Sequence, residues 1–136
     1  LEWFLGRARA VFGLLDTIVH TYEVEDIATV VLKFENGAQG IVDNYFNVPD
    51  RAARNLLEIY GTKGVIFAEN TIGQDGGGNL FWYEGMPGEY DAAQKRDETS
   101  YRKIALAPEP LYAQEVDAFS LWIRGGEKPA ISYEIG

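Results

Sequence analysis

Residues 24–42 read VEDIATVVLKFENGAQGIV, and this stretch decides the fold of the chain. Apolar and polar residues alternate, and β-branched residues are frequent, on both sides of Glu35-Asn36-Gly37. This pattern is typical of two antiparallel strands joined by a tight turn. The stretch therefore predicts a long β-hairpin, with strands over roughly 26–34 and 38–46.

The register of this hairpin follows from how each turn sorts apolar residues between the two faces. A two-residue turn at Asn36-Gly37 places Phe34 beside Gln39 and mixes apolar with polar residues. A turn with Glu35 and Asn36 at its centre and Gly37 left-handed pairs Phe34 with Ala38 instead. The second register sorts the residues better, and we predict it.

Under this register the two faces differ in character. The first face suits a covering helix and holds Ala28, Val30, Leu32, Phe34, Ala38, Gly40 and Val42. The second face is too apolar for plain solvent and too polar for a core, which is typical of a protein–protein contact surface. The predicted interface residues on this second face are Ile27, Thr29, Val31, Lys33, Gln39, Ile41, Asp43 and Tyr45.

Outside the hairpin, the pattern predicts further strands and one long helix. The strands are expected over residues 8–18, 55–60, 64–68, 80–83 and 101–106, and the helix over residues 111–124. Tyr112, Val116, Phe119 and Ile123 form one apolar stripe along this helix. The stripe predicts that the helix seals one face of the sheet, with Phe119 in the core.

Both ends of the chain resemble interrupted elements. Residues 1–5 are typical of the last turn of a helix, which Gly6 closes, and residues 132–134 resemble a helix start. We therefore expect a single domain over residues 1–136 that is truncated at both ends.

Composition excludes several function classes. The 136 residues include no cysteine, so disulfides, thiolate metal sites and cysteine nucleophiles are excluded. The net charge of −9 opposes binding to nucleic acid or to anionic membranes, which require a basic surface. No apolar run approaches the length of a membrane span, and we expect a cytoplasmic protein.

Several stretches together resemble the C-terminal domain of the glucose–fructose oxidoreductase / inositol dehydrogenase / MocA (Gfo/Idh/MocA) superfamily of NAD(P)-dependent oxidoreductases. These stretches cover most of the chain apart from residues 70–105. They are EWFLG at 2–6, VED at 24–26 with FENGA at 34–38, EIYGTKGVI at 58–66, Tyr112-x-x-Glu115-x-x-Ala118-Phe119, and GEKP at 126–129. The resemblance implies an α+β fold: an open, largely antiparallel sheet with helices on one face and the other face used for oligomerisation.

The resemblance also implies that the chemistry lies outside this chain. The sequence has no Gly-x-Gly-x-x-Gly phosphate-binding fingerprint, so no cofactor-binding residue is assigned. In the family the catalytic lysine belongs to a Glu-Lys-Pro motif of an N-terminal Rossmann domain, which is absent here. Residues 127–129 repeat those letters in the wrong context, because they follow a helix. The family's catalytic Asp and His would precede Leu1, so no catalytic residue is assigned.

Two functions from different classes follow. The first is a fragment of an NAD(P)-dependent oxidoreductase acting on a sugar, polyol or related hydroxy compound. This fragment would supply substrate-pocket walls and the subunit interface and would be inactive alone. The expected partners are the missing Rossmann domain and further copies of the chain, in a homo-oligomer formed through the open sheet face. The alternative is a stand-alone β-sheet oligomerisation or scaffold module without small-molecule chemistry.

A few side chains are candidates for small-molecule contacts. The resemblance places Arg51, Arg54 and Tyr112 near the family's substrate, where arginine donors could hold hydroxyls or a carboxylate. A solvated loop for the arginines and a core position for Tyr112 remain open.

Other side chains receive no functional role. His20 is the single histidine, so no metal-binding pair exists, and Ser120 has no histidine beside it. Glu23, Glu25 and Asp26 could bind a hard cation, but we predict a solvated approach to the hairpin. We expect Trp82 and Tyr83 to serve packing or an interface.

Overall fold

The structure is a computed structural model, and it describes residues 1–73, 76–85, 92–93 and 101–129. The predicted helix start at residues 132–134 lies outside the described residues. Contacts divide the chain into two compact units, one formed mainly by Leu1–Ala53 and the other by Arg54–Glu127. Within the described residues each unit contains one antiparallel sheet, so the predicted α+β class with open antiparallel sheet structure is confirmed.

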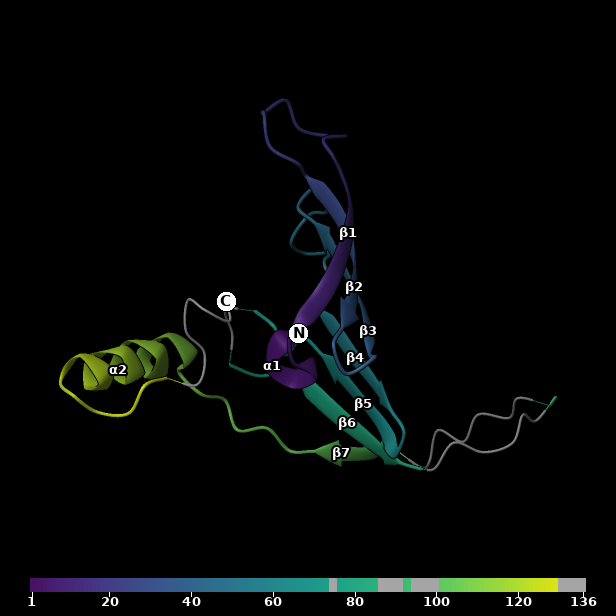
Figure 1. The fold of residues 1–136 in the computed structure, drawn as a ribbon. Helices are drawn as coiled ribbons and strands as arrows, with labels where there is room; N and C mark the ends of the chain where they lie inside the picture. Colours follow the sequence, from purple (N-terminus) through teal and green to yellow (C-terminus); the bar gives the residue numbers. More distant parts are fainter. Residues whose placement is uncertain (74–75, 86–91, 94–100, 130–136) are drawn as a thin grey trace. The chain divides into compact units, whose positions relative to one another are not determined.

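The first unit holds the helical turn α1 (Glu2–Leu5) and the strands β1 (Ala8–Asp16), β2 (Ile27–Phe34) and β3 (Gln39–Tyr45). The strands lie in the order β1-β2-β3, with β2 in the centre (Figure 1). Gly6, at a φ of 77°, closes α1 by donating its N–H to the Glu2 carbonyl at 2.8 Å. The prediction of a helix end closed by this glycine is confirmed.

The hairpin adopts the predicted register. Lys33 pairs with Gln39, and the Phe34 N–H donates to the Ala38 carbonyl at 3.0 Å. Gly37 is left-handed at a φ of 93°, and its N–H donates to the Phe34 carbonyl at 3.1 Å. The Asn36 side-chain oxygen accepts the Ala38 N–H at 2.9 Å, which fixes the turn. Turn chemistry therefore sets which side chains share each face of the first sheet.

The core of the first unit lies on the face that the sequence assigns to a covering helix. Phe34 is fully buried at 0 % exposure. Its ring lies over Gly40, where an added Cβ would meet the Phe34 ring and the Leu1 side chain, each at 3.2 Å. The Asn36 side-chain amide donates to the Leu5 carbonyl at 2.9 Å, which ties α1 to the hairpin turn. The helical turn α1 thus covers the Phe34 face at the hairpin end.

The second unit holds β4 (Leu56–Gly61), β5 (Gly64–Glu69), β6 (Asn79–Glu84), β7 (Arg102–Ile104) and the helix α2 (Leu111–Ile123). Its strands lie in the order β4-β5-β6-β7. Ala68 is buried at 3 % exposure. On the face opposite Ala68, Phe67 and Phe81 pair with ring centroids 6.2 Å apart, and Lys103 lies 5.9 Å from the Phe81 ring.

The predicted burial of the stripe on α2 is wrong for this structure. The helix forms where the sequence places it, but none of its residues is buried, and Phe119 is 54 % exposed. Periodicity specifies which side of a helix is apolar, but it does not specify the surface that this side contacts.

Candidate subunit interface

The register of the first sheet brings all eight predicted interface residues to one face. Cross-strand partners project to the same side, and side chains along a strand alternate between sides. The pairs Ile27–Tyr45, Thr29–Asp43, Val31–Ile41 and Lys33–Gln39 therefore share one face. Strand β1 adds further residues through the pairs Ala10–Lys33, Phe12–Val31, Leu14–Thr29 and Asp16–Ile27. We call this surface the mixed face; it comprises Ala10, Phe12, Leu14, Asp16, Ile27, Thr29, Val31, Lys33, Gln39, Ile41, Asp43 and Tyr45.

The interface predicted from the sequence did not include any residue of β1. Phe12 and Leu14 alternate along a predicted strand, which was the available signal. The pattern does not show which strand pairs with this one. A long loop separates β1 from β2, so the sequence does not fix the register between them. The structure supplies this register, and with it two more large apolar side chains.

The mixed face exposes these apolar side chains. Phe12 is 61 % exposed, Leu14 62 % and Ile41 67 %, and Val31 and Tyr45 are also exposed. Such a contiguous apolar surface is typical of an interaction site.

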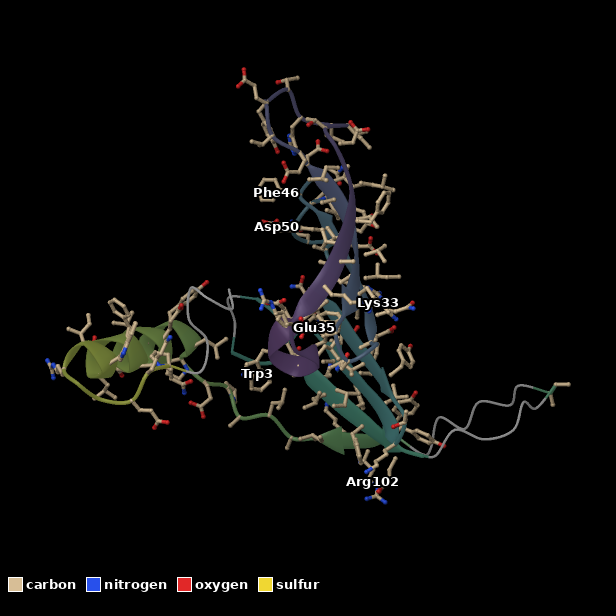
Figure 2. All side chains as sticks on the ribbon, in the orientation of Figure 1. Trp3, Lys33, Glu35, Phe46, Asp50 and Arg102 are labelled. Carbon is tan, nitrogen blue, oxygen red and sulfur yellow. The ribbon has the colours of Figure 1, made fainter. Side chains whose placement is uncertain are left out.

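Two hydrogen bonds organise the polar groups of the mixed face. The Thr29 hydroxyl donates to the Asp43 carboxylate at 2.8 Å, and the Lys33 ammonium donates to the Gly37 carbonyl at 2.7 Å. In Figure 2, Lys33 and Glu35 lie nearer one end of the first sheet, whereas Phe46 and Asp50 lie nearer the other end. The two opposite charges of Lys33 and Asp43 are separated along the mixed face: Lys33 lies next to the hairpin turn, and Asp43 lies further from that turn.

A buried carboxylate shapes the loop that joins β1 to β2. Asp26 is only 1 % exposed. Its side chain accepts the backbone N–H groups of Ile18 at 2.9 Å, Val19 at 2.8 Å and His20 at 2.9 Å. Burial raises the pKa of Asp26, but these three donors together with the charge of His20 outweigh it and lower the pKa to about 2. The prediction of a solvated Asp26 is therefore wrong.

The same loop also determines the surroundings of the single histidine. The His20 ring stacks on Tyr22, with centroids 4.8 Å apart, and lies 6.5 Å from the Phe46 ring. The described residues contain no cluster of three or more acidic or histidine side chains that could hold a metal ion. His20 is therefore placed by loop packing.

The substrate-facing candidates lie at exposed positions. Arg51 lies in a turn that begins at Pro49. The Pro49 carbonyl accepts the N–H groups of Ala52 at 2.8 Å and Ala53 at 3.1 Å. Arg54 is exposed at the start of the second unit, and Tyr112, in the first turn of α2, is 59 % exposed. Among the described residues, no hydrogen bond or ring contact joins Arg54 to Tyr112. Their roles toward a substrate stay predictions.

The remaining candidates have local structural partners. The Ser120 hydroxyl donates to the Val116 carbonyl at 2.7 Å, as serine does within a helix. The rings of Tyr83 and Tyr101 pack together, with centroids 5.6 Å apart.

None of the helices in the described residues is long and apolar enough to cross a membrane.

Comparison with known proteins gives consistent relatives. Residues 1–67 match the GFO/IDH/MocA C-terminal domain. Over 122 residues, the chain is 30 % identical to the myo-inositol 2-dehydrogenase of Thermotoga maritima, an alignment that covers 82 % of this chain and 30 % of that protein.

Solved structures share the fold. One is an oxidoreductase from Desulfitobacterium hafniense assigned as NADPH-dependent, with a TM-score of 0.72 and 20 % identity over 98 % of this chain and 37 % of that one. Another is the WlbA dehydrogenase of Bordetella pertussis in complex with NADH and UDP-GlcNAcA, with a TM-score of 0.58 and 20 % identity over 94 % of this chain and 32 % of that one. The chain spans about a third of the length of these relatives.

Proposed function

Because this chain belongs to the GFO/IDH/MocA family, we propose that it is the part of an NAD(P)-dependent oxidoreductase that builds the subunit interface and the walls of the substrate pocket. Hydride transfer belongs to a dinucleotide-binding part outside this chain. The substrate class is a sugar, a polyol or a related hydroxy compound. The named activity of the Thermotoga maritima relative supports this class.

The exposed apolar surface of the mixed face carries the interface proposal. Phe12, Val31 and Ile41 pair in one row across the three strands, and all three are exposed in the isolated chain. Covering such a surface removes apolar area from water, which is favourable by roughly 25 cal/mol per Å². The opposite face holds the buried Phe34, but Val11 and Leu15 on that face are also exposed, at 67 % and 59 %. The row of three exposed apolar side chains, flanked by polar groups, is therefore what supports association through the mixed face.

We propose that the dinucleotide binds outside the described residues. A phosphate site of the Rossmann type needs a glycine-rich turn between a strand and a helix. Here β1 is followed by the loop that Asp26 organises and then by β2. The described residues therefore provide no such turn after β1, and no chemical step through a nicotinamide is assigned to this chain. The NADH in the WlbA dehydrogenase complex supports an NAD(P) cofactor for the longer protein.

For the pocket walls, we propose that Arg51, Arg54 and Tyr112 face the substrate. Guanidinium groups present several donors in a fixed geometry, which suits hydroxyl or carboxylate oxygens. All three side chains are exposed, so their polar groups are accessible to a ligand.

The test of the interface is sedimentation equilibrium of the purified chain at tens of micromolar. We expect an oligomer, and we expect Val31→Asp to convert it to a folded monomer, because a buried unpaired carboxylate is costly. Val11→Asp is the matched control, since Val11 is 67 % exposed and lies on the opposite face of the same sheet. A monomeric parent chain would contradict the proposal, as would equal loss of association in both variants.

A further inference from the structure

The mixed face is built as a series of rows across β1, β2 and β3, and one row differs from its neighbours. Phe12, Val31 and Ile41 form a row that is wholly apolar. The next row toward the hairpin contains Lys33, and the next row in the other direction contains Asp43. The charged rows therefore flank the apolar row on opposite sides, each two residues away along a strand.

These positions distinguish two ways of packing the face on a second copy of itself. Association of identical faces is isologous, so each contact occurs twice around a two-fold axis. If the axis runs along the strands, the rows stay aligned and Lys33 of one copy meets Lys33 of the other. If the axis runs across the strands through the apolar row, that row stacks on itself and the Lys33 row meets the Asp43 row.

Charge favours the second arrangement. Like charges placed together across an interface are unfavourable, whereas opposite charges select the orientation of association. Packed sheets lie about 10 Å apart, and the extended side chain of lysine can cover most of that gap. Asp43 lies on β3, next to the Thr29 position of β2 that Lys33 of the other copy would face.

We infer that the mixed face packs on the same face of a second copy with its strands antiparallel, so that the Phe12–Val31–Ile41 rows stack and Lys33 of each copy pairs with Asp43 of the other. This inference rests on the proposed subunit interface and adds its orientation and its charge pairs. The Thr29 hydroxyl, which donates to Asp43 at 2.8 Å, holds the carboxylate in place. Lys33 exchanges its bond to the Gly37 carbonyl for a carboxylate partner.

Charge exchange tests the pairing. Lys33→Asp places two carboxylates together and Asp43→Lys places two ammonium groups together, so each variant should weaken the dimer by about tenfold or more. Mixing these two variants should restore the affinity in a heterodimer, because each copy then meets its opposite charge. Asp50→Lys, at an exposed turn position, is the control and should leave the dissociation constant unchanged. Circular dichroism confirms that each variant is folded.

A distance measurement tests the orientation independently of the charges. The chain has no cysteine, so Glu35→Cys, at the exposed hairpin turn, provides a single site for a spin label. Residue 35 lies four residues beyond the apolar row, about 14 Å along the strand at ~3.4 Å per residue. Antiparallel packing therefore separates the two labels by about 27 Å or more, whereas parallel packing brings them to within roughly 15 Å.

The outcomes separate the two proposals. A monomeric wild-type chain overturns the subunit interface and this inference together. A dimer that forms with close spin labels, or one in which Asp43→Lys has no effect and mixing restores nothing, overturns only the antiparallel pairing. A dimer with distant labels and affinity restored in the mixture supports both.

Discussion

Phe34→Ala should lower the free energy of unfolding of this chain by about 3 kcal/mol. Phe34 is fully buried, and both its ring and the side chain of Leu1 lie close to Gly40. Removing its ring loses roughly 2 kcal/mol of apolar transfer free energy. A cavity of about 100 Å³ would add up to ~2.4 kcal/mol at ~24 cal/mol per Å³. The four-residue α1 can settle toward the sheet and recover part of this second cost, which places the loss near 3 kcal/mol.

Urea unfolding followed by circular dichroism and tryptophan fluorescence measures this loss. Phe12→Ala is the matched control: the same substitution in the same sheet, but at a side chain that is 61 % exposed on the mixed face. At protein concentrations below self-association, the control should lose less than about 1 kcal/mol. A loss below about 1 kcal/mol for Phe34→Ala, or equal losses for both variants, would show that the core of the first unit does not lie on the Phe34 face.

The remaining predictions concern the loop, the turn and the cofactor. Because Asp26 has a folded pKa of about 2, below the ordinary 3.8, its contribution to stability is present above about pH 4 and is lost as pH falls through 2. The urea midpoint of Asp26→Asn should therefore approach that of the wild type between pH 4 and pH 2, whereas Asp50→Asn should parallel the wild type. Gly37→Ala should lower the free energy of unfolding by about 1–2 kcal/mol, because Gly37 has a φ of 93°, a left-handed conformation that is unfavourable for alanine. Urea unfolding measures this loss, and an unchanged free energy would show that position 37 accepts alanine without strain. Calorimetric titration of this chain with NADH and NADPH should detect no binding, and a dissociation constant at or below the micromolar range would refute the assignment of the cofactor to another part of the protein.

The hairpin was predictable from the sequence because its information is local. Glu35, Asn36 and Gly37 define the turn, and the turn defines the register of both neighbouring strands. Register then sorts every side chain between two faces, so the same three residues determine that Phe34 and Val31 project to opposite sides of the sheet. The predicted interface residues share a face for this reason.

Features that depend on distant partners were not predictable. Asp26 belongs to an acidic stretch that is indistinguishable from a solvated one until the loop folds back and offers three backbone donors. The contribution of Phe12 and Leu14 to the mixed face depends on a pairing across that loop. The stripe on α2 is readable as a stripe, but the surface that would cover Phe119 is not specified by periodicity.

Strand β2 links stability to association through this register. Phe34 projects to the core side, and the adjacent Lys33 projects to the mixed face. A slip of one residue would exchange the two sides, placing a lysine in the core and a phenylalanine in the interface. The left-handed Gly37 that fixes the register therefore fixes both the core and the charge pattern of the interface. A turn variant that retains the register should lose stability while keeping its dimer affinity, whereas one that slips should lose both together.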